Sequence, residues 1–335
     1  MGKRMSVAQV NPLNADCLTA VKTCSQFELK AVYSRSKGSA DQLVELNGSA
    51  IDVYFEAEAP RDRSLDALLS RDDIQAVMIA LPIVLQPKFI KACLSAGKHV
   101  LSEKPMAPSV EICRELLAFH SNLDFKPVFM ISEPIRFDPA FTKTAELTHQ
   151  RLGRICAFSL EWYTEILPSD PLHVGEWRRN PEHQGGYIFD GGVHYMAAIR
   201  KIVPGTVHTV SAVGRQIQEH LPPLDTIHSV LKMNDGLTGT FALSYGCQSF
   251  FFEFRIHGER GIVKLSQMKV KFEGSGLEES YDFTEDSWFS EAMRLEYTAF
   301  ANAILEGDFN TLASPEEALK DVAMVTFYLT VLMKD

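Results

Sequence analysis

The sequence predicts an α/β fold: an N-terminal doubly wound parallel sheet, followed by an α+β domain with a large, open, mainly antiparallel sheet. Two observations predict it. Between Ser6 and Ser132, short apolar runs rich in β-branched residues alternate with amphipathic helical stretches, which is typical of βαβ units. From Cys156 onward longer strand-like runs take over, and Asn234-Asp235-Gly236 between two of them indicates a tight hairpin.

The first part is expected to contain six strands joined by five helical crossovers. The strands are predicted at residues 7–10, 29–33, 53–55, 76–81, 99–101 and 128–131. The helices are predicted at residues 13–24, 39–46, 64–70, 86–96 and 109–120. A helical crossover returns the chain parallel to the preceding strand, so this order favours a doubly wound sheet. After Arg136-Phe137-Asp138-Pro139, one more helix, ending near Gly153, leads into the second part.

The second part is expected to consist mainly of long strands. They are predicted at residues 157–163, 207–213, 226–233, 237–245, 250–257 and 261–272. One helix starting near Asp190 interrupts them, and helices at 290–305 and 315–332 close the chain. The run Phe250-Phe251-Phe252-Glu253-Phe254 is interpreted as a strand buried on both faces. Because a broad apolar sheet face favours association, a homodimer or larger homo-oligomer is predicted.

Composition excludes several classes of function. A length of 335 residues allows two domains, and 46% hydrophobic with 23% charged residues is ordinary for a globular protein. The formal net charge of −10, without a basic cluster, argues against nucleic acid or an anionic membrane as a partner. The cysteines and histidines lack metal-ligand spacing, so no metal is expected. Neither a run near the roughly 20 residues of a membrane span nor a signal-like leader occurs, so a cytoplasmic location is expected.

The motif Glu103-Lys104-Pro105 stands where the fifth strand is predicted to end. Ligands of open parallel sheets bind beyond the carboxyl ends of the strands, and Ala80-Leu81-Pro82 ends the preceding strand in the same way. Lys104 is therefore a candidate active-site residue. The alternative is a solvent-exposed lysine that precedes a proline turn.

A second motif places a carboxylate and an imidazole four positions apart, at Asp190 and His194. On a helix both side chains lie on one face, about 5 to 6 Å apart at their β-carbons. An imidazole with a pKa of about 6.5 suits proton transfer, and a lysine can stabilise a developing oxyanion. The alternative for Asp190 is a helix N-cap. The glycine pairs at 185–186 and 191–192 allow either close approach of a ligand or tight turns.

Taken together, these motifs resemble those of the glucose-fructose oxidoreductase and inositol dehydrogenase family, Gfo/Idh/MocA. The resemblance rests on Ser102-Glu103-Lys104-Pro105, on Trp177-Arg178-Arg179-Asn180-Pro181 with Gly185-Gly186, on Asp190-Gly191-Gly192-Val193-His194, and on Leu221-Pro222-Pro223-Leu224-Asp225-Thr226. It covers nearly the whole chain. It implies a Rossmann-type dinucleotide-binding-like domain at residues 1–135 and a substrate and oligomerisation α+β domain at 136–335, whose C-terminal helices can pack back on the first domain.

The resemblance also implies the roles of individual residues. Members mostly transfer hydride between NAD(P) and a hydroxyl carbon of a sugar, polyol or related compound. Lys104 corresponds to the lysine that contacts nicotinamide and substrate, Asp190 to a substrate-binding or proton-relay carboxylate, and His194 to the acid/base. The implied cofactor-binding residues are Ser34, Arg35, Ser36, Ala80, Leu81, Pro82, Glu103 and Lys104. The expected substrate pocket consists of Glu133, Arg136, Tyr163, Trp177, Arg178 and Tyr187; its aromatic members, with Trp162, are alternatively core residues.

The sequence departs from the family after the first strand. The family has a glycine-rich loop there, which lets the backbone approach the pyrophosphate. This chain has no glycine between Val10 and Gly38, and Asn11-Pro12 brings a residue without an amide N–H. Asp16 would add charge repulsion if it entered the first helical turn. Arg35, after the second strand, suits the 2′-phosphate of NADP; the alternative is a solvated loop arginine.

Three functions follow from these observations. The first is an oxidoreductase that transfers hydride between NADP(H) and a hydroxyl or carbonyl carbon of a small molecule. The second is a cofactor-independent enzyme on the same scaffold, such as an isomerase, epimerase, dehydratase or cyclase. It would use Lys104, Asp190 and His194 for acid/base chemistry because the glycine loop is lost. The third is a non-catalytic regulator that binds a ligand in the cleft.

Overall fold

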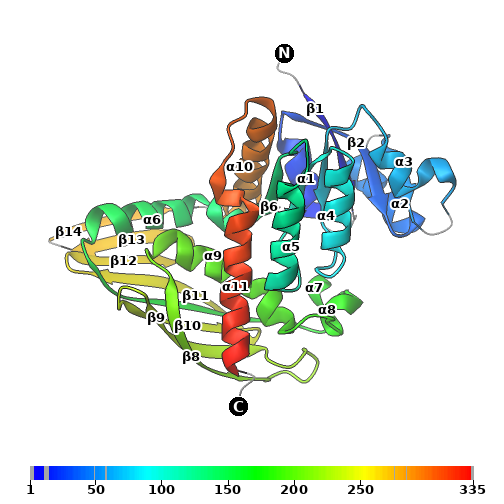
Figure 1. Ribbon diagram of the computed structural model, residues 1–335. Coiled ribbons are helices and arrows are strands. Elements are labelled where there is room, and N and C mark those ends of the chain that lie inside the picture. The colour runs from blue at the N-terminus through cyan, green and yellow to red at the C-terminus, as the bar shows by residue number, and fades with distance from the viewer. Residues whose placement is uncertain are drawn as a thin grey trace. The chain divides into compact units, whose positions relative to one another are not determined.

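The structure is a computed structural model, and it describes residues 4–10, 15–48, 50–56, 59–274, 276–283 and 285–332 (Figure 1). The chain folds into two compact units. We call the first, Met1–Pro134 with Ser290–Leu319, the parallel-sheet unit. We call the second, Ile135–Phe289 with Lys320–Asp335, the open-sheet unit.

The parallel-sheet unit is built on six parallel strands in the order β3-β2-β1-β4-β5-β6. The strands are β1 (Met5–Val10), β2 (Phe27–Ser34), β3 (Asp52–Phe55), β4 (Ala76–Ile79), β5 (His99–Glu103) and β6 (Phe129–Ser132). The chain reverses direction across the sheet between β1 and β4, as the doubly wound topology requires. β4 and β6 are buried throughout, which explains their uninterrupted apolar sequences. The predicted Rossmann-type fold is confirmed.

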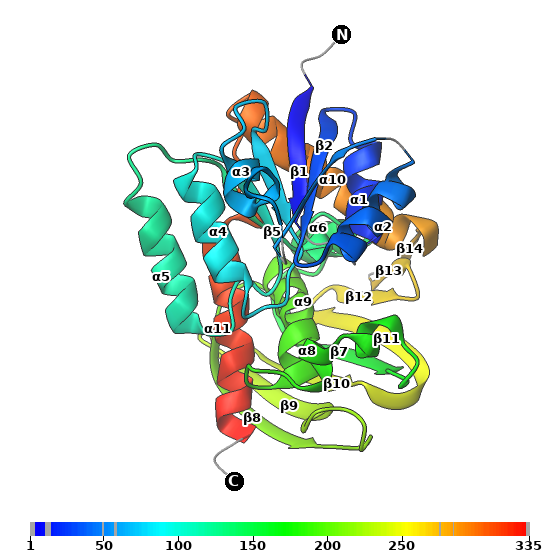
Figure 2. The same cartoon turned by 90° about the vertical axis from the view of Figure 1, so that its right-hand side faces the viewer.

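Serine caps set the starts of three crossover helices. The helices are α1 (Ala15–Thr23), α2 (Lys37–Asn47), α3 (Leu65–Leu69), α4 (Gln86–Ser95) and α5 (Val110–Ser121), and α10 (Glu285–Leu305) joins them from late in the sequence. Ser36, Ser64 and Ser109 each accept a hydrogen bond from the backbone N–H three residues on. Figure 2 shows α4 and α5 side by side along the sheet. Phe27 of β2 packs its ring against Tyr297 and Phe300 of α10.

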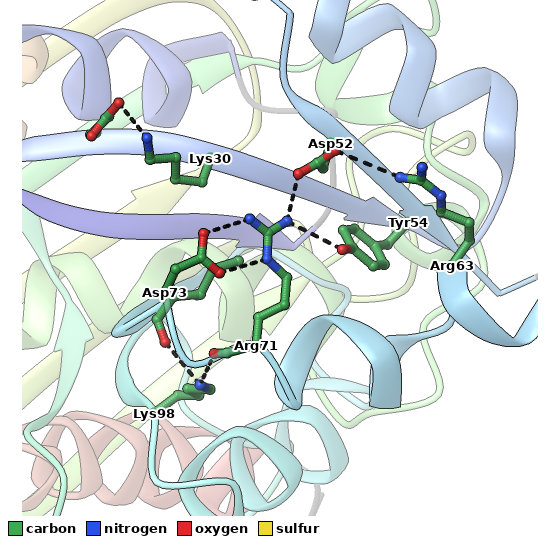
Figure 3. Close-up of polar contacts among 9 residues, drawn as sticks. Lys30, Asp52, Tyr54, Arg63, Arg71, Asp73 and Lys98 are labelled. Carbon is green, nitrogen blue, oxygen red and sulfur yellow. Dashed lines mark hydrogen bonds and ion pairs between the residues drawn. The ribbon is translucent and has the colours of Figure 1, made fainter.

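An ionic network joins the amino ends of the strands (Figure 3). The Arg71 guanidinium donates to Asp52 at the start of β3 (2.6 Å), to both oxygens of Asp73 (2.8 and 2.7 Å) and to the Tyr54 hydroxyl (3.2 Å). The ion pair with Arg71 lowers the pKa of Asp73. The buried Lys98, before β5, donates to the carbonyls of Arg71 (2.6 Å) and Ile74 (2.8 Å). The network therefore fastens the loops at this end of the sheet.

Replacing Lys98 by Met should lower the free energy of unfolding by about 1–3 kcal/mol, because two carbonyls lose a charged donor that is held out of water. Chemical denaturation monitored by circular dichroism measures this. Lys88 is exposed on α4, so Lys88→Met serves as the matched control and should change stability by no more than about 0.5 kcal/mol. Equal effects of the two substitutions would contradict a structural role for the Lys98 ammonium.

The open-sheet unit contains an eight-stranded sheet in the order β14-β13-β12-β11-β7-β10-β9-β8. The strands are β7 (Ile155–Glu165), β8 (Val207–Arg215), β9 (Thr226–Met233), β10 (Thr238–Ser244), β11 (Gly246–Gly258), β12 (Gly261–Ser266), β13 (Lys269–Gly274) and β14 (Leu277–Asp282). All neighbours pair antiparallel except β7 and β10. The predicted large, mainly antiparallel sheet and the hairpin at residues 234–236 are confirmed.

Two details of the strand prediction are wrong. The segment predicted as one strand at 261–272 is a hairpin of β12 and β13, because the chain turns at Gln267 and Met268, which both adopt positive φ. The run Phe250–Phe254 is buried on both faces only in its second half. Phe252, Glu253 and Phe254 are buried, whereas Phe250 and Phe251 remain 53% and 38% exposed.

Helices cover one face of this sheet (Figure 1). They are α6 (Pro139–Arg151), α9 (Gly186–Ile202) and α11 (Pro315–Leu332), with the short α7 (Pro171–Val174) and α8 (Glu176–Arg179). Aromatic contacts fix them: Phe141 of α6 stacks on Phe252, and Tyr328 of α11 meets Phe241 of β10 edge-on. On the strands, Val213 and Val230 stay 72% and 53% exposed. The homo-oligomer predicted for this sheet stays a prediction.

None of the helices in the described part of the chain is long and apolar enough to cross a membrane.

Candidate active site

Helix α9 carries Asp190 and His194, the acid/base pair predicted from the sequence. It begins at Gly186 after Gly185 in the left-handed conformation, so Asp190 lies in its second turn, and the alternative that Asp190 is the N-cap is wrong. Tyr187, Asp190 and His194 are spaced i, i+3 and i+7 and therefore share one face of the helix. Tyr187 and Asp190 are buried, and His194 is half-buried. The predicted pairing of Asp190 with His194 on one helix face thus holds.

Arg178 of α8 forms an ion pair with Asp190. Its Nε donates to the Asp190 Oδ2 at 2.9 Å, and its guanidinium lies 4.1 Å over the Trp177 ring. Both partners are largely shielded from water, with side-chain exposures of 25% and 11%, so the pair is less screened than a surface ion pair. Stacking and ion pairing together fix the direction of the carboxylate. The structure therefore brings together Trp177, Arg178 and Asp190, three of the site residues that were predicted from the sequence.

Tyr245, which follows β10, is a part of this cluster that sequence analysis missed. Its phenol is fully buried; burial and, secondarily, the charge of Asp190 raise its pKa. The Tyr245 hydroxyl lies so close to Gly191 that a β-carbon there would come within 1.7 Å of it. Gly191 and Gly192 lie inside α9, so the tight-turn explanation for this pair is wrong; the close neighbour at Gly191 is a tyrosine of the same chain, and close approach of a ligand stays a prediction. No local pattern around residue 245 signals this contact.

His173 of α7 is a second residue that the sequence did not indicate. Its Nδ1 lies 3.0 Å from the Tyr187 hydroxyl. Burial lowers the pKa of His173 and raises that of Tyr187 to about 12. A neutral imidazole accepting from a neutral phenol is therefore the expected state near pH 7. Burial likewise lowers the pKa of His183, which lies beside Phe189, while the charge of Asp190 opposes this shift.

Gly191→Ala should destabilise the open-sheet unit by about 1–3 kcal/mol, because the added methyl forces Tyr245 out of its position in a packed core. Thermal and chemical unfolding measure this. Gly38, inside α2, has open space where a β-carbon would lie, so Gly38→Ala should instead leave stability unchanged or raise it by up to about 1 kcal/mol. Unchanged stability of Gly191→Ala would show that Tyr245 is free to move.

The parallel-sheet unit holds the residues predicted for the cofactor. Lys104 directly follows β5, and Ala80-Leu81-Pro82 directly follows β4. These two strand ends are neighbours, since Ile79 pairs with Ser102. At the end of β2, Ser34 is buried, Arg35 is exposed, and Ser36 caps α2. Within this unit the strand-end residues predicted from sequence therefore lie along one edge of the sheet.

The described residues fit a dinucleotide. Arg35 supplies a charged donor and Ser36 a hydroxyl beside the first turn of α2, the chemistry that a phosphate on the adenosine ribose requires. The strand ends at Ala80 and Lys104 offer the edge against which the other half of a dinucleotide would lie. The loop at residues 11–14, with Asn11-Pro12, lies outside the described residues, as does the side chain of Asp16. The described residues therefore fit the two ends of a dinucleotide.

Three residues predicted for the substrate pocket have other surroundings within their own units. Arg136 is buried and pairs with Asp321 of α11, which also accepts from Arg200 at 2.6 Å. The backbone N–H of the buried Glu133 donates to a carboxyl oxygen of Glu296 at 2.6 Å. Tyr163 stacks on Phe251, on the face of β7 opposite to Trp162, whose ring contacts Tyr195 of α9. The period of two along a strand separates these neighbours, so the structure does not bring Tyr163 to α9.

Comparison with known proteins covers both units. The family described as "Oxidoreductase family, NAD-binding Rossmann fold" matches residues 11–124, and the one described as "Oxidoreductase family, C-terminal alpha/beta domain" matches residues 145–329. The dehydrogenase FPY6 of Fusarium mangiferae is 34% identical over 313 residues, which make up 92% of this chain and 90% of that relative. The two halves of the chain are thus matched in the order in which they occur.

Solved structures share the fold over almost the full length. An oxidoreductase from Thermotoga maritima has a TM-score of 0.86 at 27% identity, and covers 98% of this chain and 96% of its own. A 3-ketoreductase from Actinomadura kijaniata, solved with NADP and TDP-benzene, has a TM-score of 0.80 at 21% identity over 98% of each chain.

Proposed function

Because the chain belongs to the Gfo/Idh/MocA oxidoreductase family, we propose that it transfers hydride between NADP(H) and a hydroxyl or carbonyl carbon of a small molecule. The chain is an NAD(P)-dependent oxidoreductase; the preference for NADP(H), the substrate class and the residue roles are our proposal. The observation that carries it is the face of α9 on which Asp190, held by Arg178, and His194 lie together. A fixed acid/base pair of this kind suits alcohol oxidation and carbonyl reduction.

The cofactor is held, in this proposal, at the carboxyl ends of the strands in the parallel-sheet unit. Arg35 and Ser36 bind the 2′-phosphate, and residues 80–82, with Glu103 and Lys104, bind the nicotinamide half. When bound, the nicotinamide supplies or accepts the hydride. In this proposal these contacts bind the cofactor even though the loop after the first strand has no glycine.

His194 is assigned the proton transfer. It takes the hydroxyl proton of an alcohol substrate or returns one to the carbonyl oxygen. Asp190 orients the substrate, and Arg178 holds the direction of its carboxylate. A relative from Actinomadura kijaniata that is 26% identical over 92% of this chain is a dTDP-3,4-didehydro-2,6-dideoxy-alpha-D-glucose 3-reductase, which supports a sugar-like substrate. Trp177 and Tyr187, which lie next to Arg178 and Asp190, are proposed to line the substrate pocket.

Titration with NADPH and NADH should give tighter binding of NADPH, which nicotinamide fluorescence measures. Arg35→Ala should weaken NADPH binding by about tenfold or more, the effect of losing a charged hydrogen bond, and should leave NADH binding nearly unchanged. Arg61 is also exposed in the same unit, so Arg61→Ala is the control and should change neither affinity. A preference for NADH would contradict the role of Arg35. No binding of either nucleotide would favour cofactor-independent acid/base chemistry instead.

Single substitutions Lys104→Met, Asp190→Asn and His194→Asn should each lower turnover by about 100-fold or more, because each removes a charge or proton carrier from the transition state. The assay follows NADPH absorbance with a panel of sugars, polyols and their ketones. His208 is exposed on β8, so His208→Asn is the matched control and should retain full turnover. Unchanged turnover in all three variants would remove the proposed site.

A further inference from the structure

Glu296 of α10 is a fully buried carboxyl group that binds the end of β6. Its Oε1 accepts from the backbone N–H of Glu133 at 2.6 Å, and its Oε2 lies 2.5 Å from the Ser132 hydroxyl. All three residues belong to the parallel-sheet unit. One side chain, brought from far along the sequence, therefore satisfies both polar groups at the point where the last strand of the sheet ends.

Burial raises the pKa of Glu296 to about 8. The charges of Glu103 from β5 and Glu133 after β6 raise this pKa further, and the two hydrogen bonds of the carboxyl group lower it. Glu103 and Ser132 line one narrow cavity with Tyr297 and Gln9. Gln9 is fully buried, and neither atom of its side-chain amide has a hydrogen-bond partner among the residues that the structure describes, so it does not compensate the carboxyl. Glu296 is thus expected to be a neutral acid near pH 7.

The end of β6 is coupled to the strand that carries Lys104. In the parallel pairing of β5 with β6, Glu103 lies opposite Ser132, the same serine that Glu296 contacts. Lys104 is the next residue after Glu103. A side chain that fixes Ser132 and Glu133 therefore restrains, through one rung of the sheet, the backbone from which Lys104 leaves β5.

We propose that Glu296 is a positioning residue: through Ser132 and Glu133 it fixes the end of β6 and, with it, the strand end that presents Lys104. All the residues that take part in this restraint belong to the parallel-sheet unit. A consequence for catalysis rests on the function proposed above for Lys104. Glutamine preserves the restraint, because its carbonyl accepts from the Glu133 N–H and its amide donates to Ser132. Leucine fills similar space and abolishes both contacts.

The protonation of Glu296 couples stability to pH with a defined sign. Its pKa is 4.5 as a free side chain and about 8 in the fold, so between these values the folded state holds one proton that the unfolded state has lost. Stability from this group is therefore highest at low pH and declines as pH rises from 4.5 to 8. Glu296→Gln removes this decline. The melting temperature of Glu296→Gln minus that of the unsubstituted protein should increase steadily from pH 5 to pH 8.

Glu291 of the same helix provides the matched control. It is partly exposed and bonds to Arg294, which lowers its pKa. Its contribution is complete above pH 4.5, so Glu291→Gln should show a constant difference in melting temperature between pH 5 and pH 8. A constant difference for Glu296→Gln as well would overturn the buried, protonated state of Glu296.

Hydrogen exchange read by mass spectrometry tests the restraint without any ligand. Glu296→Leu should speed exchange both in residues 129–134 and in residues 99–105, while Glu296→Gln and Glu291→Gln should match the unsubstituted protein. Faster exchange confined to residues 129–134 would overturn the coupling to Lys104. Faster exchange throughout the unit would show that Glu296→Leu loses packing in general. In that case the pH dependence of the melting temperature of Glu296→Gln decides whether Glu296 is buried and protonated.

NADPH binding tests the connection to function. For the unsubstituted protein the dissociation constant should rise about tenfold from pH 7 to pH 9, because ionised Glu296 adds charge beside Glu103 and Glu133. It should stay level for Glu296→Gln, and Glu296→Leu should bind weakly at both values. A pH dependence retained in Glu296→Gln would overturn the link. If the unsubstituted protein binds no NADPH, the proposed function fails, and hydrogen exchange alone judges the positioning role.

Discussion

The parallel pairing of β4, β5 and β6 fixes which residues lie together at the carboxyl edge of the first sheet. In a parallel sheet all carboxyl ends lie on one edge, so residues that follow different strands become neighbours. Ile79 opposite Ser102, and Glu103 opposite Ser132, set the height at which each strand ends. Lys104 leaves β5 at that height. The network around Arg71 joins the amino ends of the same sheet, so these ionic contacts and the residues proposed for the cofactor occupy opposite edges.

In the open-sheet unit the constraint is different, because Asp190 and His194, the proposed acid/base pair, lie on a helix that packs against a sheet. Gly191 removes the side chain that would otherwise separate α9 from Tyr245. The carboxylate of Asp190 then lies among aromatic rings, where an unpaired charge is costly, and Arg178 compensates it. Close packing at Gly191 and charge compensation at Asp190 therefore occur one residue apart on the same helix.

Sequence analysis found the strands of the parallel sheet because each is a short apolar run bounded by helical stretches, and it found Asp190 with His194 because a helix converts their spacing into a shared face. It merged β12 with β13, since Gln267 and Met268 give no turn signal of the glycine or asparagine kind. It missed Tyr245, His173 and Glu296 for one reason: each acts on residues distant in sequence, and periodicity reports only the local element.

Local sequence pattern was enough to predict the fold class, the elements of the parallel sheet and the motif positions of Lys104, Asp190 and His194, because apolar period and strand-end position are properties of neighbouring residues. The groups that these residues meet became known only from the folded chain. The ion pair of Arg178 with Asp190, and the carboxyl of Glu296 under the end of β6, form when segments apart in the chain are packed together and desolvated. Hydrogen bonding and the cost of buried charge select such partners after the chain has folded, and no local pattern encodes them.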